Sequence, residues 1–360
     1  MSTTTITEPS TVLQPQSEKK QHPAPLLLAG ALDKFNHDEL TPVIGREYPS
    51  VNLVDDIINA KNSDELIRDL AITISQRGVV FFRAQDNLTD DIQKALVQRL
   101  GELSGKPSES TLHIHPLLNG SHEFGVEDNE ISTISSSAFK AFATAPKDRD
   151  DRRGGAASWH SDIQFEPYPA DYTSLRLTQL PPTGGDTLWA SGYEIYDRFS
   201  DYYQKFFEGL TATFRGEGFI KAADARPDKY QIYEQPRGNP DNVGRELTAV
   251  HPVVRTNPVT GWKSIFAIGN FPQRINEVSA RESRELLDLL YKRIEENHDL
   301  QVRFKWRNKN DIAFWDNRSV FHSATNDYEQ DRVGHRAVGI GEKPYFDPRS
   351  QSRTVALSGK

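Results

Sequence analysis

The stretch Trp159-His160-Ser161-Asp162 is one of two that decide how this sequence is interpreted, and the second is Trp315-Asp316-Asn317-Arg318-Ser319-Val320-Phe321-His322. If the first stretch is extended, His160 and Asp162 point to the same side, because side chains alternate along a strand. His322 must then come from a distant strand that the fold brings alongside. Two imidazoles and one carboxylate are the ligand set that holds Fe(II) on one face and leaves other positions open. The pattern therefore predicts a metal site made of these three side chains.

The triplet alone is a weak signal, since His-x-Asp or His-x-Glu occurs by chance in many proteins. His37-Asp38-Glu39 is a second instance, in a polar segment near the N-terminus. A histidine hydrogen-bonded to a neighbour, at the surface or in the core, is the ordinary alternative for His160 and His322. Arg332, ten residues after His322, favours the metal site. A guanidinium binds a carboxylate bidentately, which suits a dicarboxylate co-substrate.

Composition excludes several classes of protein. The 360 residues carry a net charge of −8 and contain no cysteine. The acidic balance and the lack of a basic stripe argue against a nucleic-acid partner, and no apolar run reaches the ~18 residues that span a membrane. Without cysteine there are no disulfides, thiolate nucleophiles or thiolate metal ligands. We therefore expect a cytoplasmic protein that binds neither nucleic acid nor membrane, and a homo-oligomer is compatible with the sequence.

The domain organisation is expected to be simple. Residues 1–25 are rich in Ser, Thr, Gln and Pro and lack the apolar core of a signal peptide. We expect a disordered N-terminal arm over residues 1–27, a single domain over 28–350 and a C-terminal tail over 351–360. Helices are predicted at 63–77 with Ser63 as N-cap, at 88–103 with Thr89 as cap, at 193–207, and at 279–298 with Ser279 as cap.

Short strands separated by Pro/Gly turns make up the rest of the pattern. They are predicted at 78–83, 172–180, 186–190, 302–306, 311–315 and 334–341, with a hairpin of 249–256 and 264–268. This arrangement favours an α+β fold with a double-stranded β-helix (jelly-roll) core and flanking helices, rather than a doubly wound parallel sheet. Residues 130–157 and 226–245 are predicted to be irregular. The first is expected to be a solvated loop, with a lid as the alternative because it leads into His160.

Several blocks in the same order resemble the taurine/α-ketoglutarate dioxygenase family of Fe(II)-dependent oxygenases. The resemblance covers roughly residues 43–346. Its blocks are Leu112-His113-Ile114-His115-Pro116, Trp159-His160-Ser161-Asp162, Leu180-Pro181-Pro182-Thr183-Gly184-Gly185-Asp186-Thr187-Leu188-Trp189, His251-Pro252-Val253-Val254-Arg255-Thr256, Asn310-Asp311-Ile312-Ala313-Phe314-Trp315-Asp316-Asn317-Arg318 and His335-Arg336-Ala337.

The resemblance implies a jelly-roll core with iron at one mouth, held by His160, Asp162 and His322. It implies that Thr187 and Arg332 bind the co-substrate 2-oxoglutarate, and that Arg336 and His115 bind the anionic head of the substrate. The ordinary alternatives are a strand threonine and surface arginines. Arg336, however, lies between His335 and Ala337 in a strand pattern, where a buried, unpaired arginine would be costly and an anion would remove that cost.

Two positions depart from the taurine-binding members of the family. Ala156 stands where they carry an asparagine, and Leu118 stands where they carry a tyrosine. The departures predict a wider, more apolar pocket, with Ile220 and Phe271 as further lining candidates. An anionic substrate with an apolar body fits such a pocket better than taurine does. Alkyl sulfonates and sulfate esters are preferred, and an amino or carboxylic acid of secondary metabolism is the alternative.

The reaction implied by the resemblance uses Fe(II), 2-oxoglutarate and O₂ to hydroxylate a C–H bond, with succinate and CO₂ as co-products. A hydroxyl on the carbon that bears a sulfonate or sulfate ester would release sulfite or sulfate and an aldehyde. A zinc hydrolase is one rival interpretation, but the chain lacks a His-Glu-x-x-His helix, and Arg332 and Thr187 would have no role. A non-catalytic jelly-roll binding protein is the other, and loss of a metal ligand would favour it.

Overall fold

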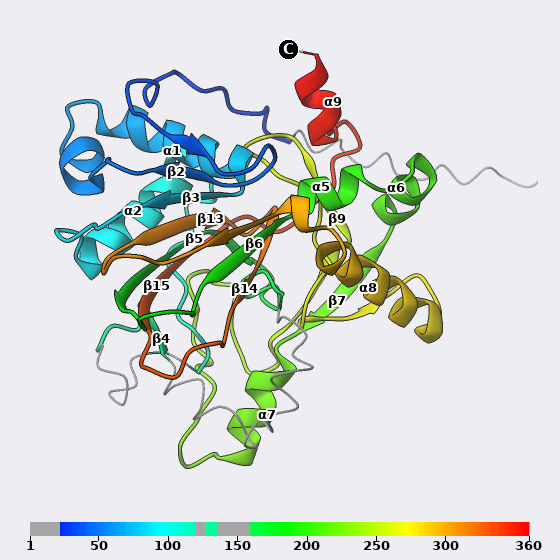
Figure 1. Cartoon of the computed structure of the whole chain (residues 1–360). Coiled ribbons are helices and arrows are strands. Elements are labelled where there is room, and N and C mark those ends of the chain that lie inside the picture. The colour runs from blue at the N-terminus through cyan, green and yellow to red at the C-terminus, as the bar shows by residue number, and fades with distance from the viewer. Residues whose placement is uncertain (1–21, 118, 120–126, 136–158, 360) are drawn as a thin grey trace, which may run out of the picture.

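The computed structural model describes residues 22–117, 119, 127–135 and 159–359, and Figure 1 shows their arrangement. A seven-stranded sheet with the strand order β1-β2-β3-β13-β5-β15-β4 forms the main framework. Its neighbouring strands are antiparallel except for the parallel pair β2–β3. The strands are β1 (Asp38–Glu39), β2 (Arg46–Tyr48), β3 (Val79–Phe82), β4 (Ser132–Ser135), β5 (Ala170–Gln179), β13 (Ile312–Asp316) and β15 (Val333–Ile340).

Three smaller sheets complete the β-structure of the described residues, with the orders β12-β6-β14, β11-β7-β8 and β10-β9. The first contains β6 (Thr187–Ser191), β12 (Gln301–Phe304) and β14 (Val320–Ala324). The second contains β7 (Thr211–Arg215), β8 (Thr248–Pro252) and β11 (Pro272–Ile275), and the third is β9 (Val254–Thr256) with β10 (Lys263–Ile265). The prediction of an α+β fold rather than a doubly wound parallel sheet is therefore confirmed.

Side chains of the seven-stranded sheet alternate between two cores, as the pleat requires. Val80 and Phe82 of β3 pack in a cluster with the helices α1 (Ser63–Arg77) and α2 (Asp90–Leu103). Val79 and Phe81 face the opposite way, into a cluster shared with the β12-β6-β14 sheet. Figure 1 shows α1 and α2 on the side of the large sheet that faces away from β6 and β14. One sheet is thus covered by helices on one face and by a second sheet on the other.

The remaining helical elements surround this framework and the smaller sheets. They are η1 (Leu53–Ile58, a π-helix), α5 (Gly192–Asp197), α6 (Asp201–Glu208), α7 (Glu217–Ala225), α8 (Ala280–Glu295), η3 (His298–Leu300, a 3-10 helix) and α9 (Arg353–Ser358). Within the described ranges, no helix is long and apolar enough to cross a membrane.

Helix caps test the local predictions. Thr89 accepts a hydrogen bond from the backbone N–H of Ile92 at the start of α2, as expected. Ser279 and Glu282 form a reciprocal capping box at the start of α8. The predicted cap of α1 was wrong by one residue, because Asn62 is the N-cap and Ser63 is already helical.

Other boundaries also differ from the prediction. The helix expected at 193–207 is two helices, α5 and α6, with Ser200 as the N-cap of the second. The strand expected at 249–256 is divided, since Val253 donates its N–H to the Leu210 carbonyl between β8 and β9. As a result, only β9 forms the expected hairpin, with β10, whereas β8 pairs with β7.

The two long segments predicted to be irregular have different outcomes. Residues 132–135 form β4, an edge strand paired with β15, so this part of the 130–157 prediction was wrong. Residues 136–158 lie outside the described part of the chain. Residues 226–245 contain neither helix nor strand, as expected. Of the expected N-terminal arm, residues 1–21 lie outside the described part, and Leu26 donates its N–H to the Val259 carbonyl. The expected C-terminal tail, residues 351–360, contains the helix α9 (Arg353–Ser358).

Candidate active site

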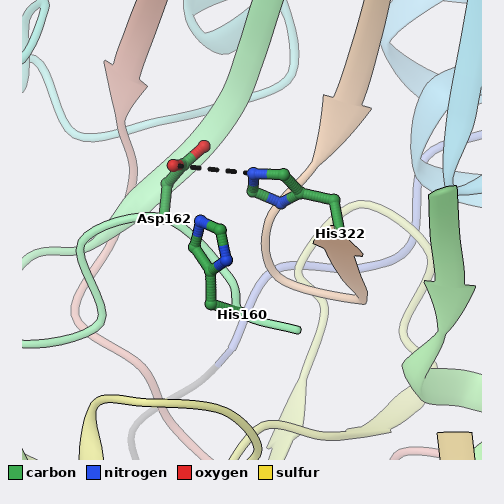
Figure 2. A group of neighbouring side chains, drawn as sticks. All are labelled: His160, Asp162 and His322. Carbon is green, nitrogen blue, oxygen red and sulfur yellow. Dashed lines mark ion pairs between the residues drawn. The ribbon is translucent and has the colours of Figure 1, made fainter. Parts of the chain in front are cut away.

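His160, Asp162 and His322 converge on one point of the fold (Figure 2). One potential ligand atom from each side chain lies within 4.8 Å of the others. His322 Nε2 lies 3.9 Å from Asp162 Oδ1, and the two imidazole centroids are 4.3 Å apart. Atoms this close can share a single metal ion, because metal–ligand bonds to nitrogen and oxygen are about 2.0–2.2 Å long. His37, the first residue of the second triplet, is exposed and lies outside this group.

Backbone pairing brings the two histidines together. His160 and His322 form an isolated antiparallel bridge in which each N–H donates to the other residue's carbonyl, at 3.1 and 2.8 Å. His322 lies in the middle of β14, opposite Trp189 of β6. The prediction that His322 comes from a distant strand is therefore confirmed.

The expected extended geometry around Asp162 was wrong. Only His160 takes part in a bridge, and a turn begins at Asp162 and continues through Ile163, whose φ is +48°. The Asn317 side chain substitutes for strand pairing, since its Oδ1 accepts the Asp162 N–H at 3.0 Å. Asn317 Nδ2 in turn donates to Thr173 Oγ1 at 2.7 Å. Asn317 belongs to the second motif, but its position in the sequence did not indicate that its side chain would hold the backbone of Asp162.

Electrostatics keep Asp162 and His322 in the protonation states that metal ligands need. Burial alone would raise the pKa of Asp162, but the positive charge of Arg336 and the two neighbouring imidazoles lower it to about 2. Burial, reinforced by His160, lowers the pKa of His322 to about 3. At neutral pH the carboxylate is therefore ionised and the His322 imidazole is neutral, as metal coordination requires. The donor set fits the two-histidine, one-carboxylate pattern of Fe(II) sites.

Thr187 and Arg332 meet at the start of β6, the central strand of the β12-β6-β14 sheet, and both side chains are buried. Arg332 donates to Thr187 Oγ1 at 3.2 Å and to the Gly185 carbonyl at 2.8 Å. Gly185 has a φ of +69°, and a Cβ there would lie 2.9 Å from Arg332 Cδ. Only glycine allows this close approach without strain. Burial lowers the pKa of Arg332 from its ordinary value, which means that the cation is poorly solvated and favours an anionic ligand.

Arg336 links the metal ligands to the predicted anion site. Its Nη1 donates to Asp162 Oδ1 at 2.6 Å, and among the described residues its buried Nε has no hydrogen-bond acceptor. His115 is buried, and its Nδ1 accepts the Leu117 N–H at 3.1 Å. Burial, followed by the charge of Arg336, holds the pKa of His115 well below its ordinary value. The neutral ring therefore carries its proton on Nε2, where it can donate a hydrogen bond.

Comparison with known proteins identifies the family. Residues 36–338 match the family described as "Taurine catabolism dioxygenase TauD, TfdA family". The chain belongs to this family. A relative from Neocamarosporium betae, alpha-ketoglutarate-dependent dioxygenase btcD, is 49% identical over 92% of this chain and 98% of its own length.

More distant relatives agree with this assignment. The alpha-ketoglutarate-dependent sulfonate dioxygenase of Saccharomyces cerevisiae is 32% identical over 86% of this chain and 68% of its own length. A crystal structure of a taurine dioxygenase from Burkholderia xenovorans superposes with a TM-score of 0.61 at 25% identity, over 88% of this chain and 92% of that chain. The protein is thus an α-ketoglutarate-dependent dioxygenase, an oxidoreductase that uses Fe(II), 2-oxoglutarate and O₂.

Aromatic rings border the site of this TauD/TfdA family member on the side of His160 and His115. The Phe271 ring lies 6.3 Å from His160, and the Phe219 ring lies 4.9 Å from His115. Phe219 and Phe271 also face each other at 6.2 Å. Ile220 follows Phe219 in α7 and packs on the same apolar cluster as Phe271.

The structure thus brings Ile220 and Phe271, two candidates for the pocket lining, to one apolar cluster. Leu118 and Ala156 lie outside the described residues. Sequence analysis missed Phe219, although its place next to Ile220 was a usable signal. It also missed Trp306, whose ring N–H donates to Thr187 Oγ1 at 3.1 Å.

Proposed function

We propose that His160, Asp162 and His322 hold Fe(II), that Thr187 and Arg332 bind 2-oxoglutarate, and that Arg336 and His115 bind the anionic head of the substrate. The two facing sheets and their shared core support a jelly-roll core for this site. When bound, the iron, 2-oxoglutarate and O₂ supply the oxidising power to hydroxylate a C–H bond. The residues of the chain bind and orient the reactants and keep water from the reacting carbon.

The substrate, we infer, is a small organic anion with an apolar body, most suitably an alkyl sulfonate or an alkyl sulfate ester. The observation that carries this inference is Arg336, which contacts Asp162 through Nη1 while its buried Nε has no acceptor among the described residues. A buried guanidinium N–H without an acceptor is costly, and a substrate anion would satisfy it. The neutral His115 would add a second hydrogen bond from its Nε2.

Aromatic side chains favour an apolar body over the amine of taurine. The side chains next to His160 and His115 include two aromatic rings and a branched aliphatic chain, those of Phe219, Phe271 and Ile220. None of these three side chains carries a charge that would pair with an ammonium. Hydroxylation of the carbon that bears the sulfonate or sulfate would give an unstable product that releases sulfite or sulfate and an aldehyde. A sulfonate substrate also agrees with the name of the Saccharomyces cerevisiae relative.

An amino or carboxylic acid remains the second candidate, because the name of the more similar relative from Neocamarosporium betae specifies no sulfonate. A carboxylate would satisfy the same Arg336 and His115 donors. We further propose a single catalytic domain over residues 28–350 and, from the absence of cysteine, a cytoplasmic location.

A chain-length series tests the proposed substrate class. Succinate formation above the uncoupled background is measured with taurine, with alkyl sulfonates and sulfates of increasing length, and with amino and carboxylic acids. Each buried methylene should add roughly 0.8 kcal/mol to binding until the pocket is full. We expect pentanesulfonate to be a better substrate than taurine, and Arg336→Ala to weaken every anionic substrate while leaving substrate-independent decarboxylation of 2-oxoglutarate intact. A preference for taurine would contradict the apolar pocket, and equal KM values for the anionic substrates in wild type and Arg336→Ala would contradict the role of Arg336.

A further inference from the structure

The polar loop before β8 forms hydrogen bonds with two segments of the candidate active site, one that carries His115 and one that follows Asp162. We call residues 230–244 of this loop the strap. On one side the strap contacts the segment that carries His115. Tyr233 donates its N–H to the Pro116 carbonyl at 2.9 Å, and the Gly238 carbonyl accepts the Thr111 N–H at 2.7 Å. Gly238 lies so close to this segment that a Cβ would be 2.4 Å from the Leu112 carbonyl oxygen.

On its other side the strap contacts the chain that follows Asp162. The Asn242 side chain accepts the Tyr168 N–H at 2.9 Å and donates to the Tyr168 carbonyl at 2.8 Å. The strap therefore spans two segments that are far apart in the sequence, one with a candidate anion-binding histidine and one with a candidate metal ligand.

A buried ion pair lies at the centre of these contacts. Arg237 donates through Nε and Nη2 to the two carboxylate oxygens of Glu166, with an Nη2–Oε2 distance of 2.9 Å. Its Nη1 donates to the carbonyls of Tyr233 and Gly244, at 2.7 and 3.0 Å. Glu166 is 0% and Arg237 is 1% exposed. Each nitrogen of this guanidinium already donates to a protein oxygen, so Arg237 is not available to a substrate.

Glu166 also contacts a histidine next to the anion site. His113 Nε2 lies 3.4 Å from Glu166 Oε1, and the His113 backbone N–H donates to the Val338 carbonyl at 2.8 Å. The His113 ring stands edge-on to the His115 ring at a centroid distance of 6.2 Å. Because Glu166 holds the His113 ring and the Val338 carbonyl holds the His113 backbone, His113 gives His115 a fixed surface to pack against.

We propose that Glu166 and Arg237 are positioning residues, and that their ion pair clasps the strap over His113 and His115 and thereby fixes where the substrate anion binds. This proposal rests on the proposed function of His115 and Arg336. The 2-oxoglutarate side is built on other segments, since Arg332 donates to Gly185 and Thr187, and Thr187 accepts from Trp306. Loss of the clasp should therefore affect the substrate and spare the co-substrate.

The chemistry of a buried ion pair indicates which variant removes the orienting contact between Glu166 and Arg237 while the protein still folds. A bidentate pair fixes the relative orientation of its partners. Its net contribution to stability is small because both charges are desolvated, and apolar residues of similar volume often replace such a pair without loss of the fold. The double variant Glu166→Leu/Arg237→Met should therefore fold but lose the clasp. Its control is Asp224→Leu/Arg245→Met, which removes an exposed ion pair that involves the same loop.

Two measurements test the proposal. The first is cleavage by chymotrypsin after Tyr230 and Tyr233 in the protein without substrate, which reports opening of the strap. We expect cleavage at least tenfold faster in the clasp variant and unchanged in the control. The second compares KM values for pentanesulfonate and 2-oxoglutarate. We expect the clasp variant to raise the first at least tenfold and to leave the second within twofold, with both unchanged in the control. If the double variant does not fold, Arg237→Lys keeps the charge, loses the bidentate geometry and serves in the same comparison.

Each outcome decides one part of the proposal. Unchanged cleavage would show that the ion pair does not hold the strap. Faster cleavage with an unchanged KM for pentanesulfonate would show that the strap has no positioning role. An equal rise in both KM values would indicate a general distortion and would also overturn the proposal. If the wild type turns over no anionic substrate, the proposed function fails and the positioning role fails with it, while cleavage still decides whether the clasp exists.

Discussion

Replacing Arg332 should weaken 2-oxoglutarate binding without weakening the fold. Arg332 is 3% exposed, and its contacts include hydrogen bonds to the Gly185 carbonyl and to the Thr187 hydroxyl. Burial lowers the pKa of Arg332, so the charged side chain costs free energy in the protein without its co-substrate. Arg332→Met removes that cost at a similar volume, and we expect the melting temperature to stay the same or rise.

The effect on the co-substrate follows from the geometry. Removing one partner of a buried, hydrogen-bonded charge pair costs about 2–5 kcal/mol, which corresponds to a rise in the 2-oxoglutarate KM of roughly 30-fold to several thousandfold. Arg332→Lys keeps the charge but loses the planar fork. The loss of about one hydrogen bond, ~0.5–1.5 kcal/mol, gives roughly a 2- to 15-fold rise for this variant.

Steady-state succinate formation, with 2-oxoglutarate and the organic substrate varied separately, is the assay. The expected order of 2-oxoglutarate KM values is wild type, Arg332→Lys, Arg332→Met, with the KM of the organic substrate within about twofold throughout. Thermal unfolding of each variant provides the control for folding. An Arg332→Met enzyme with an unchanged 2-oxoglutarate KM would refute the assignment, and so would a variant whose loss of activity is matched by a loss of stability.

Three other sets of substitutions test the metal site, the acid sensitivity of the fold and a helix cap. His160→Ala, Asp162→Ala and His322→Ala should each abolish turnover and leave the circular dichroism spectrum nearly unchanged; activity above a few per cent in all three would exclude the site. Burial and the nearby charge of Arg255 lower the pKa of His251 to about 3, below its unfolded value of ~6.5. The unfolded state thus binds more protons between these values, and stability is lost as the pH falls from about 6.5 towards 3. His251→Gln should reduce this loss, measured as the fall in melting temperature between pH 6.5 and pH 4.5, and an equal fall in both proteins would contradict the assignment. Ser279→Ala should lower the free energy of unfolding by about 1 kcal/mol in a urea titration, since it breaks the capping box of α8, whereas Ser200→Ala, at a cap without a side-chain hydrogen bond, should cost less.

Local signals predicted some elements well and failed at others for an identifiable reason. The caps at Thr89 and Ser279 depend on residues three positions away, and both were found. The break at Val253 depends on Leu210, a residue in another part of the chain, and it was missed. Strand β4 was missed for the same reason, since its polar sequence becomes a strand through pairing with β15.

The candidate site shows the same division. The residue types and the order of the motifs identified the three candidate metal ligands, and the structure brings their side chains together. The reason for their convergence was only partly foreseen. His160 and His322 meet through a backbone bridge, but Asp162 lies in a turn that the Asn317 side chain holds. A motif records which residues are present, whereas hydrogen bonds between distant segments decide how they face each other.

The sequence by itself determined the class of chemistry, because two histidines, a carboxylate and two arginines carry their ligand preferences in whatever fold presents them. It also determined the main helices and strands, whose caps and alternating side chains act between near neighbours. Only the tertiary structure decided that Arg336, 174 residues from Asp162, contacts that carboxylate. It likewise decided that Arg237 reaches Glu166 across 71 residues to hold the strap. Such contacts depend on sheet register and on the packing of two separate cores, which are properties of the whole folded chain and are not encoded in any short segment of it.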